Sequence, residues 1–220
     1  MKFLEALAFA IVYLLTCNWS QIKSFLFALT RPKERISHIY NDWITKTLFK
    51  KTGVKLETIT IFELKKIFGM MPSTPPFKPS MILSREMYET FNRDELEWVI
   101  LHEAGHYVLL HGIKLACIQI TSLMIGIYIL QITHSVIVIL SLALLFAFVY
   151  IQFGKYMEYQ ADKYSIAKVD NPNGVVTAQA KLIRSHNIDE KSFFTKYLRT
   201  QTLPSQRIAL ASKSNTRRYF

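Results

Sequence analysis

Two histidines and a glutamate in the segment His102-Glu103-Ala104-Gly105-His106 are the residues best suited to chemistry. Positions four apart lie on one face of a helix, so His102 and His106 can bind a single metal ion through their imidazoles. The carboxylate of Glu103 would lie beside that face, where it can accept a proton from water that the metal activates. The spacing therefore predicts a catalytic zinc site with one ion per chain. The alternative is a surface helix that carries two solvated histidines.

A catalytic zinc usually has three protein ligands and one open position, so a third ligand must come from elsewhere in the chain. Glu158 and Asp162 lie four residues apart in a second segment, and on a helix they would share one face. Glu158 can complete a site of two histidines and one glutamate, and Asp162 can accept a hydrogen bond from the free ring nitrogen of a bound histidine. Alternatively, these carboxylates pair with Lys155, Lys163 or lipid headgroups.

The helix that must carry the two histidines is marked at its start. Asn92 and Glu95 have the spacing of a capping box, in which two side chains satisfy backbone amides of the first turn. Apolar residues follow at helical spacing from Leu96 to Leu109. His111-Gly112 predicts the end of this helix, so the histidine pair falls in its middle.

Shorter elements precede this helix. Helical pattern covers residues 34–51, and the β-branched residues within 55–64 predict a strand. Residues 70–79 contain four prolines and predict a loop, and Met81-Ile82-Leu83-Ser84 predicts a short strand. Helices and a few short strands are therefore expected ahead of the histidine pair.

Three apolar segments, residues 3–19 and the two halves of residues 115–149, predict a membrane protein. Residues 3–19 are about long enough to cross a bilayer, and no small-residue cleavage site follows them, which favours an uncleaved anchor. Residues 22–29 are also apolar and either extend this anchor or lie along the interface. From Leu115 to Val149 there is no Asp, Glu, Lys or Arg. One helix of that length would be about 52 Å long, so two spans joined near residues 131–135 fit a hydrocarbon core of about 30 Å better.

The predicted hairpin also tests the choice of ligands, because it separates His102 from Glu158. Two spans return the chain to the side on which it entered, whereas one span would place these residues on opposite sides of the bilayer. By the positive-inside rule, the polar portions rich in Lys and Arg face the cytoplasm. We therefore expect a multi-pass protein of the plasma membrane with its catalytic part in the cytoplasm. The expected divisions are an anchor (1–30), a catalytic domain in two parts (31–112 and 154–220) and the hairpin (113–153).

Composition limits the classes of function. Hydrophobic residues make up 50% of the 220 residues and charged residues 20%, and the net charge is +11. The basic residues are spread singly or in pairs, which fits a surface facing anionic lipid headgroups better than a nucleic-acid footprint. The expected partners are thus a lipid bilayer and a peptide or protein substrate, and not nucleic acid. Cys17 and Cys117 lie in apolar stretches outside any CxxC pair, so neither a disulfide framework nor a cysteine zinc site is indicated.

The chain resembles the HtpX/CAAX-prenyl-protease family of integral-membrane zinc metallopeptidases in the order of its predicted elements. These are a short strand at residues 81–84, the helix with His102 and His106, two membrane spans and the helix with Glu158. The resemblance covers about residues 80–168 and includes Glu158-Tyr159-Gln160-Ala161-Asp162, which is similar to the family's ExxxAD helix. It implies a mostly α-helical gluzincin (thermolysin-like) core with a small β-sheet. The apolar segments of this chain add about three transmembrane helices to this core, with a hairpin inserted between the two zinc-binding helices. An edge strand formed by Met81, Ile82, Leu83 and Ser84 would bind the substrate in extended form.

The chain departs from the family in two places. Members often carry a His-Pro dipeptide followed by an Arg near the end, whereas this chain has Leu203-Pro204 and then Arg207 at a shorter spacing. Arg207 would stabilise Glu158, Asp162 or the oxyanion, or face solvent. The family also tends to have two spans before the zinc helix, where this sequence has one clear span and one ambiguous stretch.

The main hypothesis is a membrane-bound zinc endopeptidase. His102, His106 and Glu158 would hold the zinc, Glu103 would act as the general base, and Asp162 would orient a ligand. The oxyanion donor would be one of several polar side chains: Tyr156, Tyr159, His186, Tyr197 or Arg207. The other histidines are expected in surface or interfacial positions: His38, His111 and His134.

Two alternatives stay open. A site-2 intramembrane protease pairs the same motif with a later aspartate near Asn-Pro, and Asp170-Asn171-Pro172 offers one. In such enzymes the zinc helix is itself a membrane span, which the charged residues around Arg93 and Lys114 disfavour here. The other alternative is a non-enzymatic membrane protein whose zinc site is degenerate or only structural.

Overall fold

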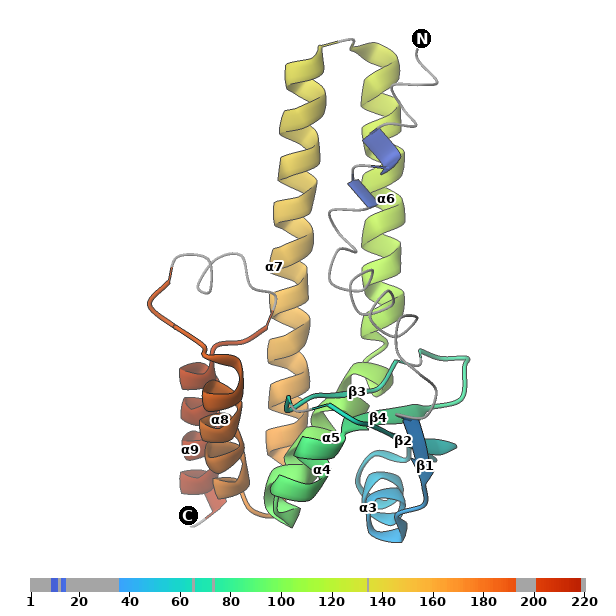
Figure 1. Cartoon of the computed structure of the whole chain (residues 1–220). Helices are drawn as coiled ribbons and strands as arrows, with labels where there is room; N and C mark the ends of the chain where they lie inside the picture. The colour runs from blue at the N-terminus through green and yellow to red at the C-terminus, as the bar shows by residue number, and fades with distance from the viewer. Residues whose placement is uncertain are drawn as a thin grey trace. The chain divides into compact units, whose positions relative to one another are not determined.

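A computed structural model describes residues 9–11, 13–14, 36–64, 66–72, 74–133, 135–192 and 201–218. The chain divides into two compact units, which can be followed by chain colour in Figure 1. The hairpin unit comprises Met1–Pro32 and Ile113–Gly154, and the α/β unit comprises Lys33–Gly112 and Lys155–Phe220. Two helices contribute residues to both units: α6 (His111–Ile132) and α7 (Val136–Lys168).

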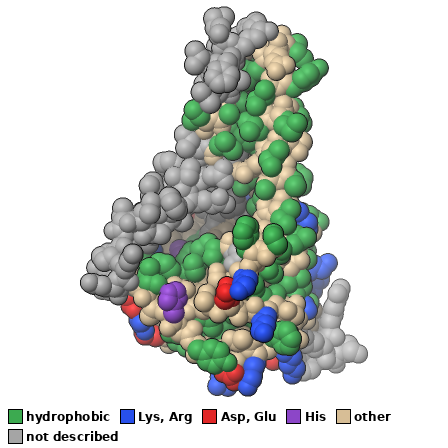
Figure 2. Space-filling view, turned by 90° about the vertical axis from the view of Figure 1, so that its right-hand side faces the viewer, with side chains coloured by type: hydrophobic (Ala, Val, Ile, Leu, Met, Phe, Trp, Pro, Cys, Tyr) green, Lys and Arg blue, Asp and Glu red, His purple; other side chains and the backbone are tan. Residues whose placement is uncertain are grey.

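Within the hairpin unit, α6 and α7 run antiparallel and are joined by a short connection at residues 133–135 (Figure 1). Among the described residues, two helical stretches are long and apolar enough to cross a membrane, His111–Ile132 and Leu140–Lys168. Their most apolar windows are only 17% and 11% buried, whereas a core helix of a soluble protein would be mostly buried. Figure 2 shows hydrophobic side chains over the hairpin and charged side chains gathered on the α/β unit. A membrane hairpin with its turn near residues 131–135 agrees with these features.

Part of the N-terminal apolar segment belongs to the hairpin unit. Its described residues are helical, and Phe9 and Tyr13 form a buried cluster with Leu130 of α6, against which Phe146 of α7 packs. The rest of the predicted anchor, including residues 22–29, lies outside the described residues. A third span therefore stays a prediction.

A mixed sheet in the described part of the α/β unit has the order β1-β2-β4-β3. Its strands are β1 (Ile36–Ile39), β2 (Thr58–Phe62), β3 (Gly69–Met70) and β4 (Ser80–Ser84). β2 pairs antiparallel with β1 and parallel with β4, and β3 pairs antiparallel with β4. The outer strands of this sheet are thus β1 and β3.

Two expectations for this region were wrong. The resemblance implies an edge strand at Met81 to Ser84, but β4 is an inner strand flanked by β2 and β3, and only its Ser80 and Ile82 side chains are partly exposed. The pattern over residues 34–51 predicts one helix, but residues 36–39 form β1, and α3 (Asp42–Thr52) begins only after the Asn41 cap. Residues 36–39 are extended because they pair with β2, a contact that local pattern does not reveal.

The central helix of the α/β unit is α5 (Arg93–Val108), which follows β4 and the short helix α4 (Arg85–Thr90). Its capping box is confirmed, since Asn92 and Glu95 exchange side-chain to backbone hydrogen bonds. Ten of its residues are buried, because α3 and α8 (Asn173–His186) both pack against it. α9 (Pro204–Arg218) packs against α8 and completes this layer of helices.

The end of α5 differs from the expectation. His111-Gly112 predicts a helix end, but α5 ends at Val108 and α6 begins at His111 after a two-residue turn. Leu110 in this turn has a φ of 58°, in the left-handed region that ends many helices. The turn redirects the chain and places His111 beside the end of α5.

Candidate metal centre

Two helices of the α/β unit supply the predicted chemistry. α5 carries His102, Glu103 and His106, and the last part of α7 carries Glu158 and Asp162. The helices approach closely at Gly105, where an added Cβ would lie 3.4 Å from the Cα of Ala161. Small residues at both positions allow the imidazoles and the carboxylates to meet.

The structure brings His102, His106 and Glu158 together as a group that could hold a metal ion. The Nε2 atoms of the two histidines lie 3.2 Å apart. Glu158 Oε2 lies 3.4 Å from His102 Nε2, and Oε1 of the same carboxylate lies 3.3 Å from His106 Nε2. A tetrahedron with metal–ligand bonds of about 2.0 to 2.1 Å has edges of about 3.3 to 3.4 Å. The three distances are therefore close to the edges of a tetrahedral zinc site.

The other ring nitrogen of His102 faces Asp162. His102 Nδ1 lies 2.9 Å from Oδ1 of Asp162, whose side chain is fully buried. A carboxylate in this place fixes the tautomer and the ring plane of a metal-ligating histidine, with Nε2 directed at the metal.

His106 is held in a comparable way by His111, a residue expected at the surface or the interface. That expectation was wrong: His111 is 1% exposed, and its Nδ1 lies 2.9 Å from Nδ1 of His106. His111 Nε2 lies 3.3 Å from Oε1 of Gln160 on α7. When His106 binds metal through Nε2, its proton is on Nδ1 and is donated to His111, which then donates its own Nε2 proton to Gln160. The three residues form a directed chain of hydrogen bonds.

Glu103 lies beside the cluster and also contacts the sheet. Its Oε2 accepts a hydrogen bond of 3.2 Å from the backbone N–H of Met71, the residue after the outer strand β3. Burial raises the pKa of Glu103 to about 7, with the charge of Glu158 adding to this and that of His102 opposing it. A carboxylate with such a pKa is suited to accept and return a proton near neutral pH.

Arg207 of α9 joins the two carboxylates. Its Nε donates to Asp162 Oδ2 at 2.8 Å and its Nη2 donates to Glu158 Oε2 at 3.1 Å. The guanidinium carbon lies 5.5 Å from the centre of the Trp98 ring, so the side chain is also packed from one face. Arg207 thus positions Glu158 and Asp162 and does not face solvent.

The surroundings shift the pKa values of His102 and His106 in opposite directions. Burial disfavours a charge on His102, yet Asp162 and Glu158 raise its pKa to about 10. Burial and the charge of His102 lower the pKa of His106 to about 4. A metal ion that binds both Nε2 atoms must therefore displace a proton from His102.

The structure places other predicted residues away from the cluster. Asp170, the alternative third ligand, pairs with Lys51 at 2.6 Å. His186 contacts the backbone oxygen of Leu182 in its own helix. Tyr197 and His134 lie outside the described residues.

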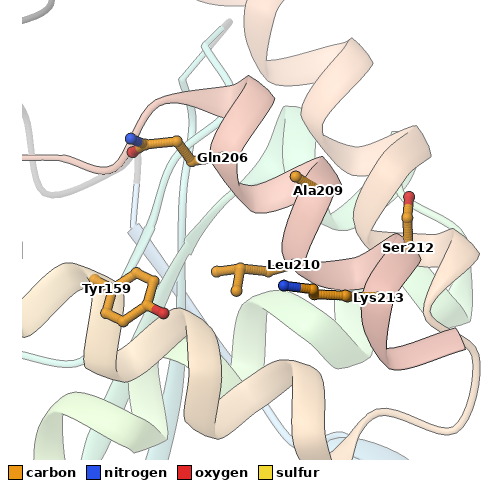
Figure 3. Close-up of a pocket in the computed structure, with 6 residues that line it drawn as sticks. All are labelled: Tyr159, Gln206, Ala209, Leu210, Ser212 and Lys213. Atoms are coloured by element: carbon orange, nitrogen blue, oxygen red, sulfur yellow. The ribbon is translucent and has the colours of Figure 1, made fainter. Parts of the chain in front are cut away.

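Tyr159 lies in a groove between α7 and α9. The groove has a volume of about 660 Å³ and is lined by Tyr159 and by residues of α9, which Figure 3 shows: Gln206, Ala209, Leu210, Ser212 and Lys213. None of the residues of the metal cluster lines it. Tyr159 is therefore a poor candidate for the oxyanion donor.

The fold and the sequence both have counterparts among known proteins. The structure of Ste24p from S. mikatae has a similar fold, with a TM-score of 0.63 and 16% sequence identity. The alignment covers 96% of this chain and 58% of that protein, so the chain spans little more than half of its length. No curated protein matches the sequence. The model of peptidase family M48 matches residues 44–214. This stretch includes His102, His106, Glu158 and Arg207, and the chain belongs to peptidase family M48.

Proposed function

We propose that this protein is a membrane-bound zinc endopeptidase that hydrolyses peptide bonds of membrane or membrane-associated proteins. The observation that carries the proposal is the spacing of His102 Nε2, His106 Nε2 and the Glu158 carboxylate, which fits tetrahedral zinc. Membership of a metallopeptidase family and a base beside the cluster point in the same direction.

The residues of the cluster divide the chemistry among them. His102, His106 and Glu158 would hold the zinc, which when bound would act as a Lewis acid toward water and the scissile carbonyl. Glu103 would accept the proton of the attacking water and deliver it to the leaving amine. Asp162 and Arg207 would keep the ligands in place, because both contact them directly. The core would then be a gluzincin with its third ligand on α7.

The substrate would bind along β3 and not along β4. β3 is the outer strand on this side of the described sheet, and an extended peptide can add to such a strand through backbone hydrogen bonds. The chain continues from β3 directly to Met71, whose amide contacts Glu103. A peptide aligned with residues 69–71 would therefore pass close to the base.

The proposed location is the plasma membrane, crossed by the hairpin and by an N-terminal span. The Lys and Arg residues of the polar portions favour a cytoplasmic α/β unit. The substrate would then be cleaved at the cytoplasmic surface of the bilayer.

The test is cleavage of an unfolded model protein by the full chain purified in detergent. We expect a chelator to abolish cleavage and zinc to restore it. We expect Glu103→Gln to lower the rate by about 10²- to 10⁴-fold while zinc stays bound. Glu86→Gln, which changes an acid in the first turn of α4, is the matched control and should have no effect. Cleavage that resists the chelator, or full activity of Glu103→Gln, would contradict the mechanism. Bound zinc without cleavage would favour the non-enzymatic alternative.

A further inference from the structure

The loop before β4 exposes the side chain of Phe77, which belongs to neither of the buried hydrophobic clusters of the described residues. Phe77 is 72% exposed, although it lies in a loop that is fixed to the rest of the α/β unit. The hydroxyl of Tyr107 donates to the backbone oxygen of Phe77 at 2.9 Å. Single exposed apolar side chains are common on protein surfaces, so Phe77 is informative only through the place at which it is held.

The same loop packs against the first turn of α6. Thr74 lies so close to Gly112 that any side chain at position 112 would collide with it. Gly112 lies three residues before Leu115, where the charge-free stretch begins. Three residues of helix span about 4.5 Å, so the loop is held within about one helical turn of that stretch.

Two more exposed apolar side chains lie in the segment between Tyr107 and Gly112. Val108 at the end of α5 is 38% exposed and Leu110 in the following turn is 40% exposed. Both are close in sequence to Tyr107 and Gly112, which hold the loop. Lys114, the last charged residue before the apolar stretch, is well placed to reach lipid phosphates. Aromatic and aliphatic side chains next to a basic residue are typical of segments that lie in a membrane interface.

We propose that Phe77, Val108 and Leu110 form a membrane-contact surface that inserts into the headgroup region of the bilayer. This surface would hold the loop before β4 and the turn between α5 and α6 at the membrane interface. The proposal rests on the membrane span of α6 that is part of the proposed function, and it does not require that the protein be a peptidase.

The experiment measures the depth of nitroxide labels on the full chain in anionic lipid vesicles. Cysteine is introduced at one position at a time, in a chain in which Cys17 and Cys117 are replaced by alanine. Test positions are Phe77 and Val108. Phe49 of α3, which is 59% exposed, is the matched control, and Ile120 of α6, which is 58% exposed, marks the span.

At Phe77 and Val108 we expect oxygen accessibility to exceed accessibility to a water-soluble nickel chelate several-fold, as it should at Ile120. At Phe49 we expect the reverse. Labels at 77 and 108 that behave like the label at 49 would overturn the proposal while leaving the span of α6 intact. A water-exposed label at Ile120 would overturn the span itself. Labels at 77 and 108 that are exposed in lipid and become shielded only when an unfolded protein is added would assign this surface to substrate instead, and would also overturn the proposal.

Discussion

His106 and His111 face each other through their Nδ1 atoms at 2.9 Å, and Nε2 of His111 lies 3.3 Å from Oε1 of Gln160. His106 thus has a partner on its far side, as His102 has in Asp162. Such partners fix the tautomer and the ring plane of a ligand and commonly affect metal affinity by about 10- to 100-fold.

We therefore predict that His111→Ala lowers zinc affinity about 10- to 100-fold without unfolding the protein. Gln160→Ala should have a smaller effect, because it removes only the outer partner. Competition with a chromogenic chelator measures both. The control is His186→Ala, which removes a histidine that contacts the backbone oxygen of Leu182 in its own helix. Unchanged affinity in His111→Ala would show that the contact does not orient His106.

Zinc affinity should depend on pH through His102. Its pKa of about 10 means that below this value zinc must displace a proton, so apparent affinity should rise about tenfold per pH unit. We place the measurement between about pH 7.5 and 9, where Glu103, with a pKa of about 7, is mostly ionised.

Asp162→Asn separates this linkage from other effects. Without the carboxylate, the pKa of His102 should fall toward its ordinary value of about 6.5, so the dependence on pH should largely disappear in the same range. An equally steep dependence in Asp162→Asn would mean that another group releases the proton.

The close approach at Gly105 should be necessary for zinc binding. An added side chain would meet Tyr164 at 3.2 Å and the backbone of Ala161 at 3.4 Å, so Gly105→Val must push α5 and α7 apart. We expect zinc stoichiometry well below one per chain. Ala167→Val introduces the same side chain at an exposed position of α7 and should leave stoichiometry unchanged. Full occupancy in Gly105→Val would show that the helices tolerate a wider spacing.

Arg207 should stabilise the fold as well as the site. Arg207→Ala leaves Glu158 and Asp162 without their cation, and losing one partner of a buried ion pair typically costs about 3 to 5 kcal/mol. Thermal unfolding in detergent should therefore begin at a clearly lower temperature. Arg85→Ala is the control, because Arg85 also bridges two carboxylates, those of Glu63 and Glu89, but at the surface. Similar losses in both variants would contradict a special role of Arg207.

Local sequence signals predicted the elements that carry the cluster. The capping box at Asn92 and Glu95 marked the start of α5, and the charge-free stretch marked the hairpin with its turn. These features depend on neighbours in the chain or on bilayer thickness, and both are visible in sequence. The spacing of His102 and His106 also depends only on neighbours in the chain, because it places both residues on one face of a helix.

Features that depend on distant partners could not be predicted in this way. β3 has only two residues, too few for a periodic pattern, yet its pairing makes it the outer strand and places β4 inside. The approach of His111 to His106 follows from a left-handed turn at Leu110, a residue type that seldom adopts it. The sequence hinted at this contact only in that a third histidine, His111, follows His106 by five residues.

The most direct test of the account is X-ray absorption at the zinc edge on the full chain loaded with one zinc ion. We predict nitrogen and oxygen neighbours at about 2.0 to 2.1 Å with the outer-shell signal of two imidazoles, and loss of the bound zinc in Glu158→Ala. A sulfur neighbour at about 2.3 Å, a single imidazole, or an unchanged spectrum in Glu158→Ala would contradict a site built from His102, His106 and Glu158.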